Sequence, residues 1–434
     1  MFASSPDDFS PVVRAHGASS PRWRIVLTSV ALSILVFALG ACGVTTTPGG
    51  EVVPPVPTPT PKPTVVPACT TWSVIPSPNA TKYQENALNA VNALSSTSAW
   101  AVGSNSQETG SSQHLSVRWD GTSWQIVPGQ SENLVGVAAI SATDVWAVGS
   151  THEGLPEPYQ TRALIEHWNG MAWSIVPSPN PDSQEYGLNG VVALSANDVW
   201  AVGSYLDLGA GARLPLIEHW NGTAWIIVTG PHLQGVHDSA LQSVTRIPGT
   251  NELWAVGYMM KGPLPAFDQA LIERWNGHGW MLVTPANPVN MTTSKLEGVV
   301  ALSATDAWAV GSYVMAGSEV SRGLIEHWNG TVWQPVTTPQ TAGIAPSQFV
   351  SVAAVGKRDV RAVGRYFVNS EGTGRALIAQ WNGTAWSVQA SPTPSGVTYS
   401  ILMAIAGDGA GHYWAVGTFT SASRHQQTLI LHCS

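Results

Sequence analysis

Short runs of alternating apolar and small or polar residues recur along the chain, separated by turn-forming residues. Between Gly187 and Val228 the runs are LNGVVALS, VWAVGSY, LIEHW and TAWIIV, with SAND after the first run and Asn-Gly after the third. Alternation with a period of two is typical of β-strands, and Asn, Asp, Ser and Gly favour turns. This stretch therefore predicts four antiparallel strands.

The same pattern returns with a period of about fifty residues, which indicates a repeat protein. The phrase WAVG marks the second run, and the intervals between its copies are 46 to 54 residues. Seven such units predict an all-β fold, a seven-bladed β-propeller whose four-stranded antiparallel blades surround a central channel. The copies begin at Trp100, Trp146, Trp200, Trp254, Trp308, Arg361 and Trp414, with Arg361 replacing the Trp of the sixth.

An Asn-Gly or Asp-Gly pair stands between the third and fourth strands of the repeats. Such pairs are strong hairpin signals, because a two-residue type I′ turn requires positive φ at both central residues. We therefore expect a type I′ hairpin there. The pairs include Asp120-Gly121, Asn169-Gly170, Asn221-Gly222, Asn276-Gly277, Asn329-Gly330 and Asn382-Gly383.

Tryptophans occupy three positions in each repeat: the first residue of WAVG, the end of the third strand and the start of the fourth. All but one of the 20 tryptophans fall there, and the other, Trp23, precedes the repeats. Two positions are exceptions, filled by Arg361 and Cys433. Side chains so large and so regularly placed predict packing between blades. The alternative is an exposed aromatic ladder for stacking ligands.

The last repeat ends in LILHCS, before a fourth strand, and the missing strand is at the start of the repeats. There CTTWSVIPSPN places Trp72 at the fourth-strand position, so we expect the N-terminal strand to complete the C-terminal blade and close the ring. In this register Cys69 and Cys433 lie within disulfide reach. An exported chain favours their pairing, the alternative being two free buried thiols.

Residues 1–41 have the layout of a secretory signal peptide, with three arginines before an apolar run that is short for a membrane span. The run closes on LGAC, which resembles a bacterial lipobox and implies acylation of Cys42; the alternative is an ordinary signal peptide. Residues 42–68 are rich in Thr and Pro and predict a semi-rigid spacer. We expect an exported lipoprotein on the outer face of the bacterial cell membrane, with the propeller at residues 69–434.

The formal net charge is −8, and the chain has no run of Lys or Arg. This balance argues against nucleic acid as a partner and against electrostatic membrane binding, so the lipid is the expected membrane contact. The low content of charged residues, 11%, and the abundant Gly and Pro suit an exported all-β protein. The sequence indicates no cofactor or metal, and we expect a monomer.

The order of elements resembles that of kelch and galactose-oxidase-like propellers. A Gly follows the hydrophobic second strand, an aromatic residue ends the third strand, and a Trp follows five residues later, as at Trp168 and Trp173. The turn from Asp120 to Trp124 is also similar to the Asp-box turn of sialidase-like propellers, but the double Gly of kelch and the leading Ser-x-Asp of the Asp box are absent. The resemblance covers all repeats and implies the fold without an activity.

The two ends of the predicted blades differ. The turns between strands one and two and between strands three and four are short and alike, and their side is called the turn face. The loops between strands two and three and the links between blades are long and differ in every repeat. Variable loops on a rigid scaffold usually carry binding, so we expect the ligand on this loop face, around the channel mouth.

Two sets of loop-face residues are candidates for binding. Aromatic residues two positions after the WAVG glycine could stack on sugar rings, although packing at the loop bases also explains them. Residues that begin the third strands could clamp an anion or bond neighbouring loops. The aromatic set is Tyr205, Tyr313, Tyr366 and Phe419, and the arginine set is Arg162, Arg213, Arg322 and Arg375.

Two further positions recur beside the tryptophans. Histidines before the third-strand aromatic position are spread round the ring, which argues against a shared metal site. Acidic residues two positions before WAVG are expected to bond turn amides. The histidines are His167, His219, His327 and His432, and the acidic residues are Asp144, Asp198, Glu252, Asp306 and Asp359.

No pair of catalytic carboxylates and no sialidase-like arginine cluster stands out at the inner strand ends. The sequence therefore favours a non-catalytic surface protein that binds an extracellular glycan or protein. The alternatives are a protein-interaction scaffold of the cell envelope and a secreted hydrolase or lyase acting on carbohydrate. A glycan binder would expose aromatic loop residues, a scaffold would expose a larger apolar patch, and an enzyme would show non-repeated polar residues clustered at the channel mouth.

Overall fold

The computed structural model describes residues 69–80, 85–106, 112–130, 132–153, 160–179, 183, 185–262, 267–339, 347–368, 373–421 and 425–434. All of them belong to the compact unit Thr64–Ser434. They form 28 β-strands and no helix, so this part of the chain also has no apolar helix able to cross a membrane. The predicted signal peptide, Cys42 and the Thr/Pro spacer lie outside the described residues.

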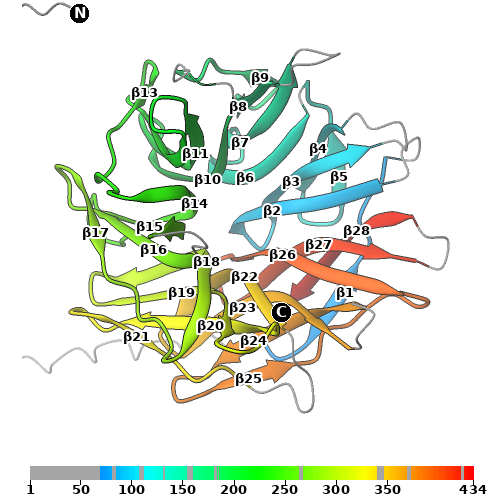
Figure 1. Ribbon diagram of the computed structural model, residues 1–434. Coiled ribbons are helices and arrows are strands. Elements are labelled where there is room, and N and C mark those ends of the chain that lie inside the picture. The colour runs from blue at the N-terminus through cyan, green and yellow to red at the C-terminus, as the bar shows by residue number, and fades with distance from the viewer. Residues whose placement is uncertain are drawn as a thin grey trace, which may run out of the picture. The chain divides into compact units, whose positions relative to one another are not determined.

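Antiparallel groups of four strands, the blades, repeat along the chain (Figure 1). The first, innermost strands are β2 (Glu85–Ser95), β6 (Asn133–Ser141), β10 (Tyr186–Ser195), β14 (Val236–Arg246), β18 (Met291–Ser303), β22 (Ser347–Gly356) and β26 (Tyr399–Gly407). The second are β3 (Ser98–Ser106), β7 (Asp144–Glu153), β11 (Asp198–Asp207), β15 (Leu253–Lys261), β19 (Asp306–Met315), β23 (Asp359–Phe367) and β27 (Tyr413–Thr420). The third are β4 (Ser112–Trp119), β8 (Gln160–Trp168), β12 (Ala212–Trp220), β16 (Asp268–Trp275), β20 (Ser321–Trp328), β24 (Gly374–Trp381) and β28 (Gln426–Cys433). The outer strands are β5 (Trp124–Val127), β9 (Trp173–Ile175), β13 (Trp225–Ile227), β17 (Trp280–Val283), β21 (Trp333–Pro335), β25 (Trp386–Gln389) and β1 (Trp72–Ile75).

Five blades are separate sheets, and one sheet has eight strands. That sheet consists of β2 to β5 and of β26 to β28 with β1, joined by the single parallel pair of Glu85 with Gln426. Strand β1 is antiparallel to β28, with Trp72 opposite Cys433. Cys69 and Cys433 form a disulfide with their Cα atoms 5.5 Å apart, so the predicted pairing is confirmed.

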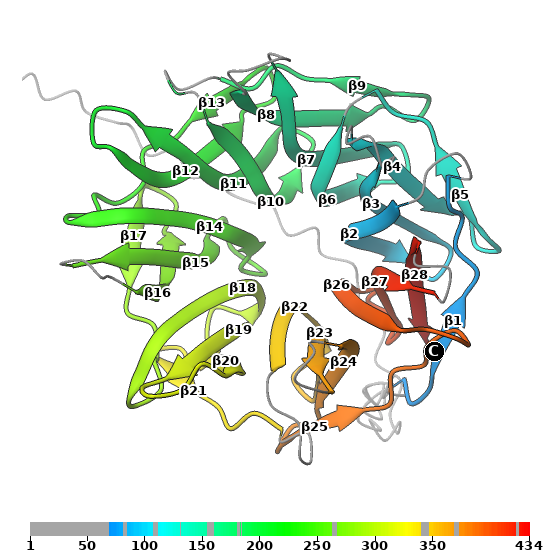
Figure 2. The same cartoon turned by 45° about the vertical axis from the view of Figure 1, so that its right-hand side comes forward.

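The innermost strands lie around the centre of the unit (Figure 2). They line one central cavity of about 160 Å³. Each of these strands has a β-bulge at the same place, where one residue is skipped in the pairing with the second strand. A bulge leaves the extra residue unpaired and bends the strand. The skipped residues line the cavity; they are Asn89, Val135, Asn189, Gln242, Glu297, Val350 and Met403.

The bulge explains the glycine of WAVG. A Cβ atom on Gly311 would lie 1.9 Å from the carbonyl oxygen of Lys295, two residues before the bulge residue Glu297. The same overlap with backbone, at 1.9 to 2.1 Å, occurs in every repeat, so only glycine fits. The other glycines are Gly103, Gly149, Gly203, Gly257, Gly364 and Gly417.

The predicted packing of tryptophans between blades is confirmed. The Trp100 ring of one blade lies 5.2 Å from Trp168 and 5.4 Å from Trp173 of the next blade, centroid to centroid. Equivalent triads form around Trp146, Trp200, Trp254, Trp308 and Trp414. Tilted and edge-on ring pairs at such distances add to the energy of burial.

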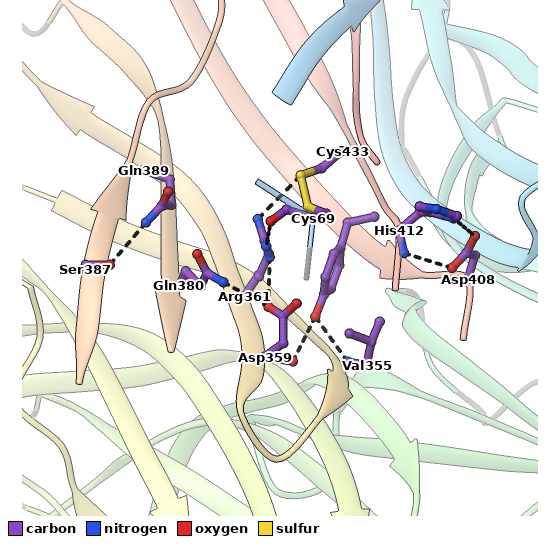
Figure 3. A network of polar contacts seen from close by, with 11 residues as sticks. Cys69, Val355, Asp359, Arg361, Gln380, Ser387, Gln389, Asp408, His412 and Cys433 are labelled. Carbon is purple, nitrogen blue, oxygen red and sulfur yellow. Dashed lines mark hydrogen bonds and ion pairs between the residues drawn. A yellow bond between two sulfur atoms is a disulfide. The ribbon is translucent and has the colours of Figure 1, made fainter. Parts of the chain in front are cut away.

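Both exceptions to the tryptophan pattern lie in the same contact between blades (Figure 3). Arg361 is 1% exposed and lies over the ring of Trp72, at 5.7 Å from its centroid. Its Nε donates to Asp359 at 3.0 Å, and its Nη2 donates to the carbonyl oxygen of Cys69. Cys433 stands at the third-strand position that is a tryptophan in the other blades. Arg361 packs on Trp72 there and hydrogen-bonds the segment that carries Cys69.

The hairpin prediction is right in position but wrong in turn type. Four residues separate the paired Trp168 and Trp173, and in the described residues only Asn290 among non-glycines has positive φ. Gly170 has φ of 95°, whereas Asn169 accepts hydrogen bonds at its Oδ1 from the amides of Met171 and Ala172. The Asn therefore contributes an Asx turn, and the glycine alone supplies the left-handed conformation.

Candidate functional site

Three of the cavities that the described residues line open on the loop face. The largest, about 860 Å³, lies between the blades of β4 and β8, and a second, about 750 Å³, lies beside β12 and the link after β13. The third, about 450 Å³, is at the channel mouth and shares four lining residues with the central cavity. We call this third cavity the mouth cavity.

The predicted aromatic set lies at the loop bases. Tyr313 and Tyr366 are half-buried against the hydrophobic clusters between blades, and Phe419 is buried in such a cluster. Tyr205 packs against another cluster and also lines the 750 Å³ cavity. Burial, together with the charge of Asp207, raises the pKa of Tyr205. These contacts match the packing explanation that the sequence left open.

The predicted arginine set mostly bonds neighbouring loops and strands. Arg162 donates to the carbonyl oxygen of Ser183 and to the hydroxyl of Tyr186, both at 3.2 Å, and lines the 860 Å³ cavity. Arg375 donates to a link carbonyl at 3.1 Å. The remaining two differ: Arg213 forms a 2.7 Å ion pair with Glu185, and Arg322 is exposed.

The mouth cavity is lined by polar side chains from several blades. Lys295 and Glu297 come from β18, Gln348 from β22, Arg365 from β23 and Tyr399 from β26. The other lining residues are Ala87, Asn89, Val350, Ile401, Met403, Thr418 and Gln426. Sequence-distant strands therefore bring two cations, one carboxylate, three amides and one phenol to the same hollow.

Arg365 is held in place by neutral partners. Its Nε and Nη2 donate to Oε1 of Gln348 at 3.2 and 3.0 Å, and its Nη1 donates to the hydroxyl of Tyr399 at 3.0 Å. Its guanidinium also lies 5.1 Å from the ring centroid of Phe367. Three hydrogen bonds to two different strands fix the plane of the guanidinium before any ligand arrives.

Acidic groups lie near Lys295, another residue of the mouth cavity. The amine of Lys295 lies 3.0 Å from Oε1 of Glu297. Burial raises the pKa of Asp268; Lys295 opposes that rise, and Asp238 adds to it. Burial, followed by the charges of Asp238 and Asp268, raises the pKa of Tyr258 as well.

The charged residues of the mouth cavity depart from the repeat. Arg365 stands where four other blades have Ser, one has Thr418 and one has Tyr258. Lys295 and Glu297 stand where the other blades have uncharged residues. Sequence reasoning looked at the inner strand ends for a carboxylate pair or an arginine cluster, and it did not single out these residues. An alignment of the repeats by their WAVG glycines would have isolated Arg365, because the fold does not require an arginine there.

The sequence predicted that the acidic residues before WAVG bond turn amides. In the structure they bond side chains instead. The carboxylates of Asp144, Asp198 and Asp306 accept from the Nε2 atoms of the next-strand histidines at 2.8 to 2.9 Å. Those histidines lie against the WAVG tryptophans, with ring centroids 4.2 to 4.3 Å apart. Glu252 pairs with Arg274, and Asp359 with Arg361. These pairs lie beside the WAVG tryptophans, or include the arginine that replaces one, near the turn face.

The sequence reasoning also missed a row of buried glutamates, the Glu of LIEHW and LIERW. Four consecutive blades have a fully buried carboxyl group on the third strand, at Glu166, Glu218, Glu273 and Glu326. Burial raises the pKa of Glu218 and of Glu273 to about 8 and that of Glu326 to about 7. Glu166 lies 2.9 Å from the ring nitrogen Nδ1 of His114. None of the four lines the mouth cavity.

These observations define the class of the protein as a β-propeller built from sequence repeats, with a cavity at its channel mouth that both polar and apolar side chains line. No protein-family model matches the sequence, and none of the curated proteins is similar to it. Solved β-propellers are similar in fold. The structure of YCF48 bound to D1 peptide is 14% identical, with a TM-score of 0.50, and the match covers 85% of this chain and 99% of that chain.

Two further propellers match with the same score. The WD40 repeats of RRP9 are 8% identical, and the match covers 85% of this chain and 99% of that chain, with a TM-score of 0.50. The GH74 xyloglucanase from Xanthomonas campestris is 12% identical, with a TM-score of 0.50 and coverage of 82% of this chain and 55% of that chain. At such identities the similarity shows the fold alone.

Proposed function

We propose that this protein binds an extracellular glycan, without catalysis, in the mouth cavity of its loop face. The observation that carries the proposal is the convergence of Lys295, Glu297, Gln348 and Arg365 on one hollow of about 450 Å³. Cavities of a few hundred Å³ with a few converging polar groups are typical of sites for small ligands. Sugar hydroxyls need both donors and acceptors, and this set provides both.

A protein-interaction scaffold is the second candidate, and one similar structure has a bound peptide. The distribution of exposed apolar side chains favours the glycan. Many of them lie on outer strands at the rim of the blades, such as Ile126, Ile226 and Met281, and none lines the mouth cavity. The charged and polar side chains that converge on the mouth cavity suit a hydroxyl-rich ligand better than an apolar protein surface.

Carbohydrate cleavage is the third candidate, because a non-repeated polar cluster at the mouth is what an enzyme would show. Hydrolysis of a glycosidic bond generally requires two carboxyl groups that flank it. Glu297 is the one carboxylate among the described residues that line the cavity, and Lys295 pairs with it. This lining supports binding over catalysis.

We also propose that the unit is a seven-bladed ring, closed where β1 completes the blade of β26 to β28. The register of β1 with β28 and the disulfide support this closure. The lipobox-like LGAC supports an acyl anchor at Cys42, and the Thr/Pro segment supports a spacer between the membrane and the folded unit. The oxidised cysteine pair suits the outer face of the cell.

Binding of the purified full chain to a panel of glycans and cell-wall polysaccharides tests the proposed function. Ala87→Trp would fill the mouth cavity and should abolish saturable binding. Gly187→Trp is the matched control, because Gly187 has the same repeat position, lies outside the cavity, and would have its nearest neighbour 3.5 Å from an added Cβ. Binding that survives Ala87→Trp, or no binding to any glycan, would refute the proposal, provided that thermal melting shows folded proteins.

A further inference from the structure

The positive charge of Arg365 indicates which class of glycan the mouth cavity binds. This inference rests on the glycan binding proposed above. Lys295 already has a carboxylate partner, Glu297, at 3.0 Å. Arg365 is half-buried and has no carboxylate partner in the part of the chain that the structure describes. An arginine charge withdrawn from water without a countercharge is costly, unless a ligand supplies one.

Three other arginines of low exposure have carboxylate partners: Arg361 pairs with Asp359 at 3.0 Å, Arg274 pairs with Glu252, and Arg213 pairs with Glu185 at 2.7 Å. Among the described residues, Arg365 instead donates to the neutral side chains of Gln348 and Tyr399. The positive charge of Arg365, which lines the mouth cavity, is therefore available to a ligand in that cavity.

The geometry of Arg365 suits a carboxylate. A guanidinium has five N–H groups, and three of them are used by Gln348 and Tyr399. One N–H remains on each terminal nitrogen and can donate to the oxygens of a carboxylate. Because the guanidinium plane is already fixed, little entropy is lost when the anion binds.

We propose that the mouth cavity binds a uronic acid unit of an extracellular acidic polysaccharide. Arg365 binds the carboxylate of the sugar. Lys295, Glu297 and Gln348 line the same cavity and bond hydroxyl groups of the ring, with Tyr399 as the apolar wall. A neutral sugar would leave the guanidinium without a countercharge, whereas a uronate supplies it.

The repeat provides substitutions that the fold already tolerates. Arg365→Ser and Lys295→Ala introduce residues found at the same positions of other blades, Ser312 and Ala87 among them. Arg246→Ser on the turn face is the control for the loss of one arginine charge, because Arg246 is exposed at the end of β14.

The experiment is isothermal titration of the full chain with an oligogalacturonate and with its methyl ester, which has the same ring without the charge. We expect the acid to bind at least about tenfold more tightly than the ester, since one charged bidentate contact is worth about 1.5–3 kcal/mol. Arg365→Ser should remove that difference, Lys295→Ala should weaken both ligands, and Arg246→Ser should change neither. The preference for the acid should shrink as salt increases.

The outcomes separate this inference from the proposed function. Equal binding of acid and ester, or a preference for the acid that survives Arg365→Ser, would overturn the inference while glycan binding stands. Tighter binding of a peptide through its terminal carboxylate than of the uronate would overturn it as well. Binding of neither oligosaccharide, with no other glycan of the panel bound, would refute the proposed function itself.

Discussion

Glu273 exemplifies how polar side chains are used in the packing between blades. Its carboxyl group is fully buried on β16, and neither oxygen has a hydrogen-bond partner among the described residues. Glu218 and Glu326 each have one partner, the hydroxyl of Ser178 and the amide of Ala286, both at 2.8 Å. Burial favours the neutral acid, so Glu218 and Glu273, whose pKa values are raised to about 8, are mostly protonated near neutral pH.

The pKa of Glu273, raised by burial to about 8 from its ordinary 4.5, makes stability depend on pH. Between these values the folded state binds more protons than the unfolded state, so the free energy of unfolding falls as pH rises from about 4.5 to about 8. We predict that Glu273→Gln removes this loss, by at most about 5 kcal/mol at pH 9, and changes little at pH 4.5. Urea unfolding at the two pH values measures it.

Glu319→Gln, at an exposed glutamate, is the control for the loss of one negative charge. If Glu273→Gln and the parent protein lose stability equally between the two pH values, the neutral state of Glu273 would be contradicted.

Within each blade the bulge of the first strand and the WAVG glycine of the second strand depend on each other. The bulge turns one side chain into the channel, and the backbone before it lies directly against the glycine. In four blades that backbone carries residues of the mouth cavity: the carbonyls of Ala87, Lys295, Gln348 and Ile401 lie over Gly103, Gly311, Gly364 and Gly417. The repeated WAVG thus positions residues that are not themselves repeated.

Gly311→Ala tests whether the bulged strand requires a glycine opposite it. The new Cβ would lie 1.9 Å from the oxygen of Lys295, so β18 must shift against β19. We predict a loss of several kcal/mol in stability, together with weaker glycan binding because Lys295 moves. Thermal melting and titration measure the two effects.

Gly356→Ala is the matched control, since nothing lies within 4 Å of its added Cβ, and it should be nearly neutral. A fully stable Gly311→Ala protein would disprove the requirement for glycine.

The sequence predicted the strands, the tryptophan packing and the cysteine pair because these follow from local periodicity and from regular repetition. It missed the bulges because a bulge depends on pairing with a second strand, which alternation alone does not reveal. Arg365 was missed for a related reason: its partners Gln348 and Tyr399 come from other strands. The Asn-Gly turn was mistaken in type because loop length, rather than the dipeptide, decides the turn.

At the scale of the whole molecule, the junction where β1 pairs with β28 and packs on Arg361 of the preceding blade differs from the other contacts that the described residues make between blades. A covalent bond and an arginine replace two tryptophans there. Tyr413 reinforces the junction: its hydroxyl donates to the carbonyl of Asp359 at 2.8 Å, and burial raises its pKa. Elsewhere the chain itself connects third and fourth strands through a turn, whereas here the disulfide makes that connection.

The disulfide joins residues 364 positions apart, so it should strongly restrict the unfolded chain. We predict that Cys433→Ser lowers the free energy of unfolding by about 5 kcal/mol on the loop-entropy estimate, and that β1 then detaches first. Thermal melting and limited proteolysis between β1 and β2 measure these effects, with Cys69→Ser and the double variant expected to match the single one. A parent protein whose melting temperature and cleavage rate are unchanged by reductant would show that the four residue pairs of β1 with β28 and the Arg361 contacts hold the junction without the covalent bond.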